Sequence, residues 1–285
     1  MLGKITLNYS PNFSTYKRIK KNIKYLVFHY TGMSSENKAV KRLIDVNSKV
    51  SCHYFIKRNG QIILMIPDLY IAWHAGKSNW DKKNSLNRNS IGIEISNKGH
   101  QFGYQKFTKT QILSLINLSK YLITKYNIKK NNILGHSDIA FDRKKDPGEK
   151  FPWKILSRRG IGIWHNINQK KLKRFRKQKI NNYDKKKIIN FLRKIGYFTN
   201  NLSDKSYVKL IEYVKNKIDV GAKQIMVDAL VIEINSSDLK EIGLNKVEYN
   251  QSKINKENSI YEDSSSVGSL RGNLDNALHK VSVYP

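Results

Sequence analysis

Histidine and acidic side chains in one short segment are suited to binding a metal ion. The chain has 7 histidines in 285 residues, and His136 lies ten positions before Asp146, so one loop could present both side chains to a metal. Pro147 disfavours helical backbone at Asp146, and in an extended stretch Lys144 points to the same side as Asp146. Histidine–aspartate pairs are common in loops, and a lysine beside an aspartate usually forms a surface ion pair. The spacing alone leaves a metal site and a solvated loop both open.

Two predicted β-strands each carry one ionisable side chain in mid-strand. Residues 23–31 are rich in β-branched and aromatic types, and their alternation places His29 on the face opposite Leu26 and Phe28. Residues 90–96 alternate so that Glu94 faces away from three isoleucines. Burying either group is unfavourable without a partner. A lone histidine in a strand, however, is more often a satisfied core residue.

Local patterns predict the elements that position these groups: a helix capped by Ser34 or Ser35 and ending near Val46, a hairpin over 50–67, an amphipathic helix over 108–126 and a short strand at 133–134. The hairpin rests on Asn59 and Gly60, because both turn residues tolerate positive φ. Strands and helices alternate along this region. We therefore predict an α/β fold, with a mixed β-sheet flanked by helices and a small C-terminal helical region.

The length of the chain suits one medium domain and something smaller. We predict a first domain over 1–168, a basic linker over 169–182, a helical region over 183–248 and a polar, disordered tail over 249–285.

The charge of the chain is strongly basic. It has 53 Lys and Arg against 22 Asp and Glu, a net charge of +31, which is typical of proteins that bind nucleic acid. Only 11 of these residues are arginine, the residue that base and phosphate contacts favour, and the lysines are spread along the whole sequence. We therefore expect no specific nucleic-acid partner. A basic protein that binds DNA through residues 170–177 is kept as an alternative.

Other features of the sequence limit its class. The single cysteine, Cys52, excludes an intramolecular disulfide framework, and we expect it to be buried. No run approaches the roughly 20 apolar residues of a membrane helix. The first ten residues lack the pattern of a signal peptide, so we expect a cytoplasmic location, with the periplasm, the envelope or secretion as alternatives.

Five segments, in order, resemble one enzyme family: FHYT (28–31), AWHAG (72–76), SIGIEI (90–95), GHSDIA (135–140) and KKDPG (144–148). They look like the zinc-dependent N-acetylmuramoyl-L-alanine amidases of the type-2 amidase family, and the likeness covers roughly residues 20–165. The later segments FPW (151–153) and GIGIW (160–164) are more similar to longer, envelope-type members than to short cytosolic ones.

The resemblance implies a role for each matching residue. His29, His136 and Asp146 would bind one Zn²⁺, leaving a coordination position for water. Glu94 would take the proton of that water, and Lys144 would stabilise the oxyanion. The implied partners are peptidoglycan or muropeptides, and the cleaved bond joins N-acetylmuramic acid to the L-alanine of the stem peptide.

Three further residues are weaker candidates for substrate binding. Tyr54 and His74 lie in family-like segments, and Asn97 follows the strand that carries Glu94. Packing in the hairpin or capping of a loop explains each of them equally well. Residues 184–217 look like the start of a three-helix peptidoglycan-binding module, but residues 224–243 do not continue that pattern.

Overall fold

The computed structural model describes residues 5–164, 189–190, 192–194 and 196–197. All of them belong to the first of two units, Met1–Ile234, while the second unit is Asn235–Pro285.

Three of the predicted regions fall largely outside the described residues. The basic linker at 169–182 and the polar tail at 249–285 lie wholly outside them, and the helical region at 183–248 lies mostly outside them. Within that region, residues 189–190 and 192–194 are helical.

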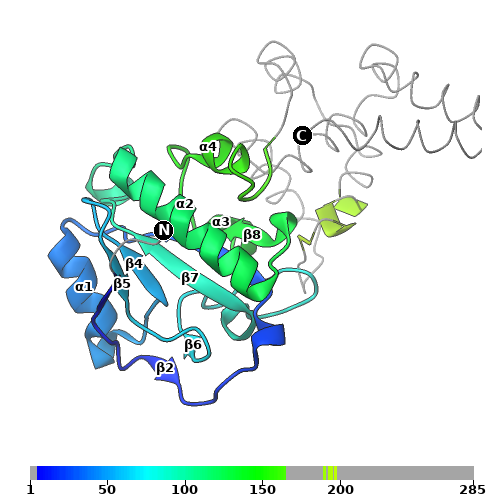
Figure 1. Ribbon diagram of the computed structural model, residues 1–285, viewed down its shortest axis with the longest axis horizontal. Coiled ribbons are helices and arrows are strands. Elements are labelled where there is room, and N and C mark those ends of the chain that lie inside the picture. The colour runs from blue at the N-terminus through cyan, green and yellow to red at the C-terminus, as the bar shows by residue number, and fades with distance from the viewer. Residues whose placement is uncertain (1–4, 165–188, 191, 195, 198–285) are drawn as a thin grey trace, which may run out of the picture. The chain divides into compact units, whose positions relative to one another are not determined.

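A six-stranded mixed sheet lies at the centre of the described domain (Figure 1). In spatial order its strands are β1 (Ile5–Leu7), β5 (Ile62–Leu64), β4 (Tyr54–Ile56), β7 (Ser90–Ile95), β3 (Tyr25–Tyr30) and β8 (Ile133–Gly135). Within this sheet β4 and β5 are antiparallel, and the other neighbours are parallel. A second, two-stranded antiparallel sheet is made of β2 (Phe13–Ser14) and β6 (Ile71–Ala72). The predicted mixed sheet is confirmed, whereas β1, β2 and β6 were not predicted.

Helices cover both faces of the large sheet, and alternation along the strands explains why. Helix α2 (Lys109–Tyr126) packs on the face that carries Leu26, Phe28 and the three isoleucines of β7. Helix α1 (Glu36–Ile44) packs on the opposite face, against Phe55. Of the two serines predicted to cap α1, Ser35 is the one that does so, and a capping box of Thr108 and Gln111 begins α2.

The remaining helices are short. Helix α3 (His136–Ile139) follows β8 directly, and α4 (Trp153–Ser157) packs Trp153 on Phe28, with ring centroids 5.7 Å apart. Single 3₁₀ turns cover Lys20–Asn22, Val46–Ser48, Asn87–Asn89, His100–Phe102 and Lys130–Asn132. In the part of the chain that the structure describes, none of the helices has the length and apolarity needed to cross a bilayer.

The β4–β5 hairpin is confirmed, but its turn differs from the prediction. Gly60 takes a positive φ of 88°, whereas Asn59 does not. Instead the Asn59 side chain accepts a hydrogen bond from the backbone N–H of Gln61 at 2.9 Å.

The topology gathers ionisable groups near the carboxyl ends of three parallel strands. His29 on β3 lies directly opposite Glu94 on β7, and both point away from α2. β8, on the other side of β3, ends at Gly135 and is followed by His136. His136 therefore begins a helical turn and does not lie in an open loop, as the spacing had suggested.

Candidate metal and catalytic site

Three buried side chains form a cluster that could hold a metal ion. Nδ1 of His29 lies 2.9 Å from Nδ1 of His136, and Oδ2 of Asp146 lies 3.1 Å and 3.0 Å from these two atoms. All three residues are buried. The structure therefore brings together the three residues expected to bind the metal, although they come from β3, α3 and the segment after α3.

Local hydrogen bonds hold the segment between His136 and Asp146 in place. The N–H of Ser137 donates to the carbonyl of Asp146 at 2.8 Å, which closes the segment into a loop. Asp138 accepts a hydrogen bond from the N–H of Gly135 at 2.7 Å and caps α3. Two neighbouring elements, β8 and α3, therefore fix both ends of the loop.

Electrostatics keep the ligands in the forms that bind metal. Burial and the nearby His136 together lower the pKa of His29 to about 4, against the opposing effect of Asp146. Burial alone would raise the pKa of Asp146, but His136 and His29 outweigh it and hold that pKa far below its usual range. A neutral imidazole and a carboxylate are the states required for coordination.

Glu94 stands beside this cluster as a strongly perturbed acid. Burial, together with the charge on Asp146, raises the pKa of Glu94 to about 8 against the opposing effect of Lys144. Its Oε2 atom is buried and has no hydrogen-bond partner among the described residues. A carboxyl with a pKa near neutral and a vacant acceptor is suited to general acid–base work.

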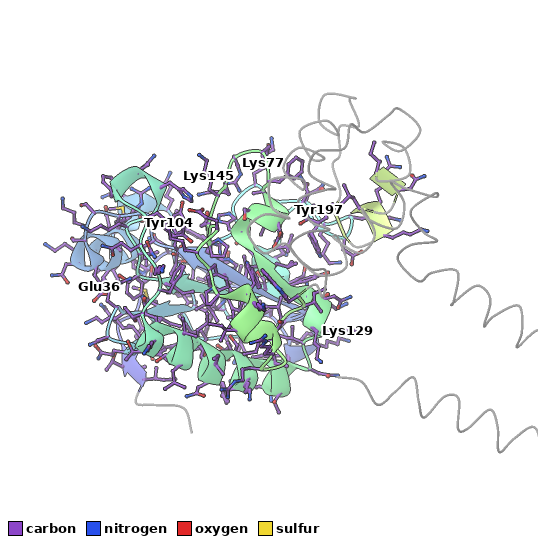
Figure 2. The ribbon with its side chains drawn as sticks, turned by 90° about the horizontal axis from the view of Figure 1, so that it is seen from above. Glu36, Lys77, Tyr104, Lys129, Lys145 and Tyr197 are labelled. Atoms are coloured by element: carbon purple, nitrogen blue, oxygen red, sulfur yellow. The ribbon has the colours of Figure 1, made fainter. Side chains whose placement is uncertain are left out.

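A cavity of about 640 Å³ opens onto these groups. Its lining includes Glu94, Lys144, His136, Asp146 and His74. Aromatic and basic side chains complete the wall, among them Trp73, Phe102, Arg42 and Lys145. Lys145 and Lys77 are labelled in Figure 2, and Arg143, two positions before Lys145, donates from Nε to the carbonyl of Lys77 at 3.0 Å.

Two of the three weaker candidates do not reach the cavity. The hydroxyl of Tyr54 donates to Asp68 at 2.6 Å, and its ring packs in the core under α2. Asn97 caps a loop, because its Oδ1 accepts from the N–H of Gly99 and its Nδ2 donates to the carbonyl of Gln105. Of the two alternatives that the sequence left open for each residue, the structure thus favours core packing for Tyr54 and loop capping for Asn97.

Sequence reasoning also missed a buried arginine behind the site. Arg18 is 2% exposed and lies 2.9 Å from Nε2 of His53. It donates to the backbone carbonyls of Asp68, Asn87 and Ser90. No motif marks it, because its partners are carbonyl groups that any residue offers. Cys52 is buried, as expected.

Comparison with known proteins identifies the same region. A family model described as N-acetylmuramoyl-L-alanine amidase matches residues 19–149. The N-acetylmuramoyl-L-alanine amidase AmiD of Escherichia coli K12 is 41% identical over 154 residues, covering 50% of this chain and 55% of AmiD. The 1,6-anhydro-N-acetylmuramyl-L-alanine amidase AmpD of Citrobacter freundii is 38% identical over 105 residues, covering 37% of this chain and 54% of AmpD. The chain thus spans about half the length of these curated relatives.

Solved structures agree with this match. AmpDH3 of Pseudomonas aeruginosa, in complex with anhydromuramic pentapeptide, has a TM-score of 0.60 at 28% identity, covering 78% of this chain and 93% of that chain. AmiD of E. coli, in complex with the substrate anhydro-N-acetylmuramic acid-L-Ala-D-γ-Glu-L-Lys, has a TM-score of 0.59 at 28% identity, covering 81% and 93%. The matching segment and the shared fold show that residues 19–149 of this chain are similar to the N-acetylmuramoyl-L-alanine amidase family.

Proposed function

We propose that the domain hydrolyses the amide bond between the lactyl group of N-acetylmuramic acid and the L-alanine of peptidoglycan stem peptides. One observation carries the proposal: the cluster of His29, His136 and Asp146 meets, through His136 and Asp146, the cavity that Glu94 and Lys144 also line. The names of the relatives, and the muramyl peptides bound in the two solved structures, support this substrate class.

Zinc is the metal that this donor set fits. Two imidazole nitrogens and one carboxylate oxygen match the three-ligand pattern of catalytic zinc, which keeps a fourth position open. The donor atoms lie 2.9–3.1 Å apart, close to the roughly 3.3 Å between ligands in a tetrahedral site with bonds of about 2.0–2.1 Å. When bound, zinc would lower the pKa of a water molecule towards about 7 and polarise the scissile carbonyl.

Glu94 is placed to move the proton in this reaction. Its carboxyl faces the cavity from β7, next to His29 on β3. As a carboxylate it accepts a proton from the attacking water while the hydroxyl adds to the carbonyl carbon. It then returns the proton to the amide nitrogen as the C–N bond breaks, releasing a peptide with a free L-alanine amine.

Lys144 supplies positive charge at the same wall of the cavity. It lies close enough to lower the pKa of both Glu94 and His29 through its charge. The carbonyl oxygen of the substrate gains negative charge during the attack, and a fixed cation beside it stabilises that charge. The basic residues Arg42 and Lys145 line the same cavity and suit the free carboxylates of a stem peptide.

The test uses the purified full chain, its metal content and two substrates. We expect about one zinc per chain, and release of the intact stem peptide from soluble anhydromuropeptides, from whole sacculi, or from both. Glu94→Gln, which keeps the size of the side chain but cannot accept a proton, should retain zinc and lose the activity. Binding of muropeptides without zinc and without peptide release would instead indicate a recognition module on the same fold.

A further inference from the structure

His74 connects the metal cluster to the strand beneath it through both nitrogens of its ring. Its Nδ1 lies 3.0 Å from Nε2 of His29, and its Nε2 lies 3.1 Å from the hydroxyl oxygen of Ser90. That hydroxyl in turn donates to the carbonyl of Leu86 at 2.6 Å. His74 is 7% exposed. Neither ring nitrogen is left for a substrate, although the ring lines the cavity.

The direction of each hydrogen bond between His29, His74 and Ser90 follows from counting protons. The single hydroxyl proton of Ser90 is committed to the carbonyl of Leu86, so Ser90 accepts from His74 and Nε2 of His74 carries a proton. A neutral imidazole with a proton on Nε2 has a bare Nδ1. Nδ1 of His74 therefore accepts from the Nε2–H of His29, and Nδ1 of His29 keeps its lone pair for the metal.

The next residue does the same for the second imidazole. The carbonyl of Ala75 lies 3.2 Å from Nε2 of His136 and, as an acceptor, requires a proton there. Nδ1 of His136 is then also bare and faces the cluster. Arg143 donates to the same carbonyl at 2.9 Å and holds it in place.

The segment that contains His74 and Ala75 is itself tightly held. The side-chain oxygen of Asn87 accepts from the N–H groups of His74 and Ala75 at 3.2 Å and 2.8 Å. The His74 ring also lies directly on the backbone of β7, where a Cβ added at Gly92 would come within 2.3 Å of it. The ring can therefore shift little without a clash or the loss of a hydrogen bond.

We propose that His74, oriented by Ser90, is a positioning residue that fixes His29 in the tautomer with a bare Nδ1, while the carbonyl of Ala75 fixes His136 in the same way. The proposal rests on the zinc site proposed above. In this proposal the role of His74 is to support a metal ligand and not, as the sequence suggested, to contact the substrate. Groups that support metal ligands typically contribute 10–100-fold to metal affinity.

The first experiment reads the tautomers directly. Long-range ¹H–¹⁵N NMR spectra of the zinc-loaded wild-type chain should show protons on Nε2 of His29, His74 and His136 and bare Nδ1 atoms. A proton on Nδ1 of His74 would overturn the proposal, because His29 could then not donate to it. This measurement needs no variant and does not depend on how any variant folds.

The second experiment measures zinc affinity by competition with a chelator. His74→Leu removes the acceptor and should weaken zinc binding 10–100-fold. His74→Asn returns an acceptor oxygen close to the position of Nδ1 and should recover most of that loss. His100→Leu is the matched control, because its ring pairs with Glu149 and Tyr30 and touches no ligand of the cluster, so affinity should stay within about twofold.

The outcomes separate the two proposals. A wild-type chain that binds no zinc contradicts the metal site itself. Two results contradict only the positioning role of His74. One is a zinc affinity of His74→Leu equal to that of the wild-type chain, and the other is an equal loss of zinc affinity in His74→Leu and His74→Asn.

Discussion

Replacing Gly92 by alanine should disturb the metal site without removing any of its ligands. A Cβ at this position would lie 2.3 Å from Cγ of His74, whereas ordinary contact begins near 3.4 Å, so the ring must move by about 1.1 Å (3.4 − 2.3). Its Nδ1 lies 3.0 Å from His29, and a shift of that size is enough to break this hydrogen bond. The φ angle of Gly92 lies outside the left-handed region, so the backbone itself accepts alanine.

The magnitude follows from the two effects of this clash. Forcing extra volume into a packed site lowers the free energy of unfolding by about 1–3 kcal/mol. Loss of the support for His29 should weaken zinc binding by roughly 10–100-fold. Denaturant unfolding of the metal-free chain measures the first effect, and chelator competition measures the second.

A double-mutant cycle assigns the effect to the His74 ring. In a His74→Ala background the space under Gly92 is empty, so Gly92→Ala should change the free energy of unfolding by less than about 0.5 kcal/mol. Equal destabilisation by Gly92→Ala in both backgrounds would refute the reasoning, since the clash would then involve another part of the fold.

Three further substitutions or conditions test other parts of the account. Glu94→Gln should lower the rate of peptide release by about 10²–10⁴-fold with unchanged zinc content, and a rate within tenfold of wild type would exclude Glu94 as the proton carrier. Tyr54→Phe should leave the KM for muropeptides unchanged but lower the free energy of unfolding by about 1–3 kcal/mol, because it removes a hydrogen bond to the buried carboxylate of Asp68; a raised KM without destabilisation would return Tyr54 to the substrate site. In the metal-free chain, burial is the largest cause that lowers the pKa of His29 to about 4 and of His53 to about 3, and it also lowers the pKa of His74. Below pH 6.5 the unfolded chain therefore binds protons that the folded chain does not, and the free energy of unfolding decreases as the pH is lowered. The raised pKa of Glu94, about 8, opposes this with one proton, and the net expectation is lower stability at pH 5 than at pH 7; equal denaturation midpoints at the two pH values would contradict it.

Sequence patterns predicted the faces of the site well but not the contacts across it. Alternation within single strands placed His29 and Glu94 away from the apolar core, because side-chain direction in a strand depends only on local backbone. That these two residues are direct neighbours depends on the register of two parallel strands some sixty positions apart, which local pattern does not encode. The metal ligands and their assembly were predicted by resemblance to a family.

The contacts that local pattern did not predict are made by polar partners distant in sequence. Tyr54 was expected in the cleft, but the side chain of Asp68, placed by the chain beyond the hairpin, draws its hydroxyl into the core. His74 lines the cavity, and its ring is held by Ser90, a contact that local pattern does not encode. Strand β1 was not predicted, because it joins the sheet by pairing with β5, more than fifty positions later in the sequence, which local pattern does not encode.

The most direct test of the central claim is mass spectrometry of the products formed from an anhydromuropeptide. The zinc-loaded chain should release an intact stem peptide with a free L-alanine amine, and chelation and Glu94→Gln should each abolish this product. Absence of the peptide with the zinc-loaded chain, or its undiminished release after complete removal of the metal, would contradict the account.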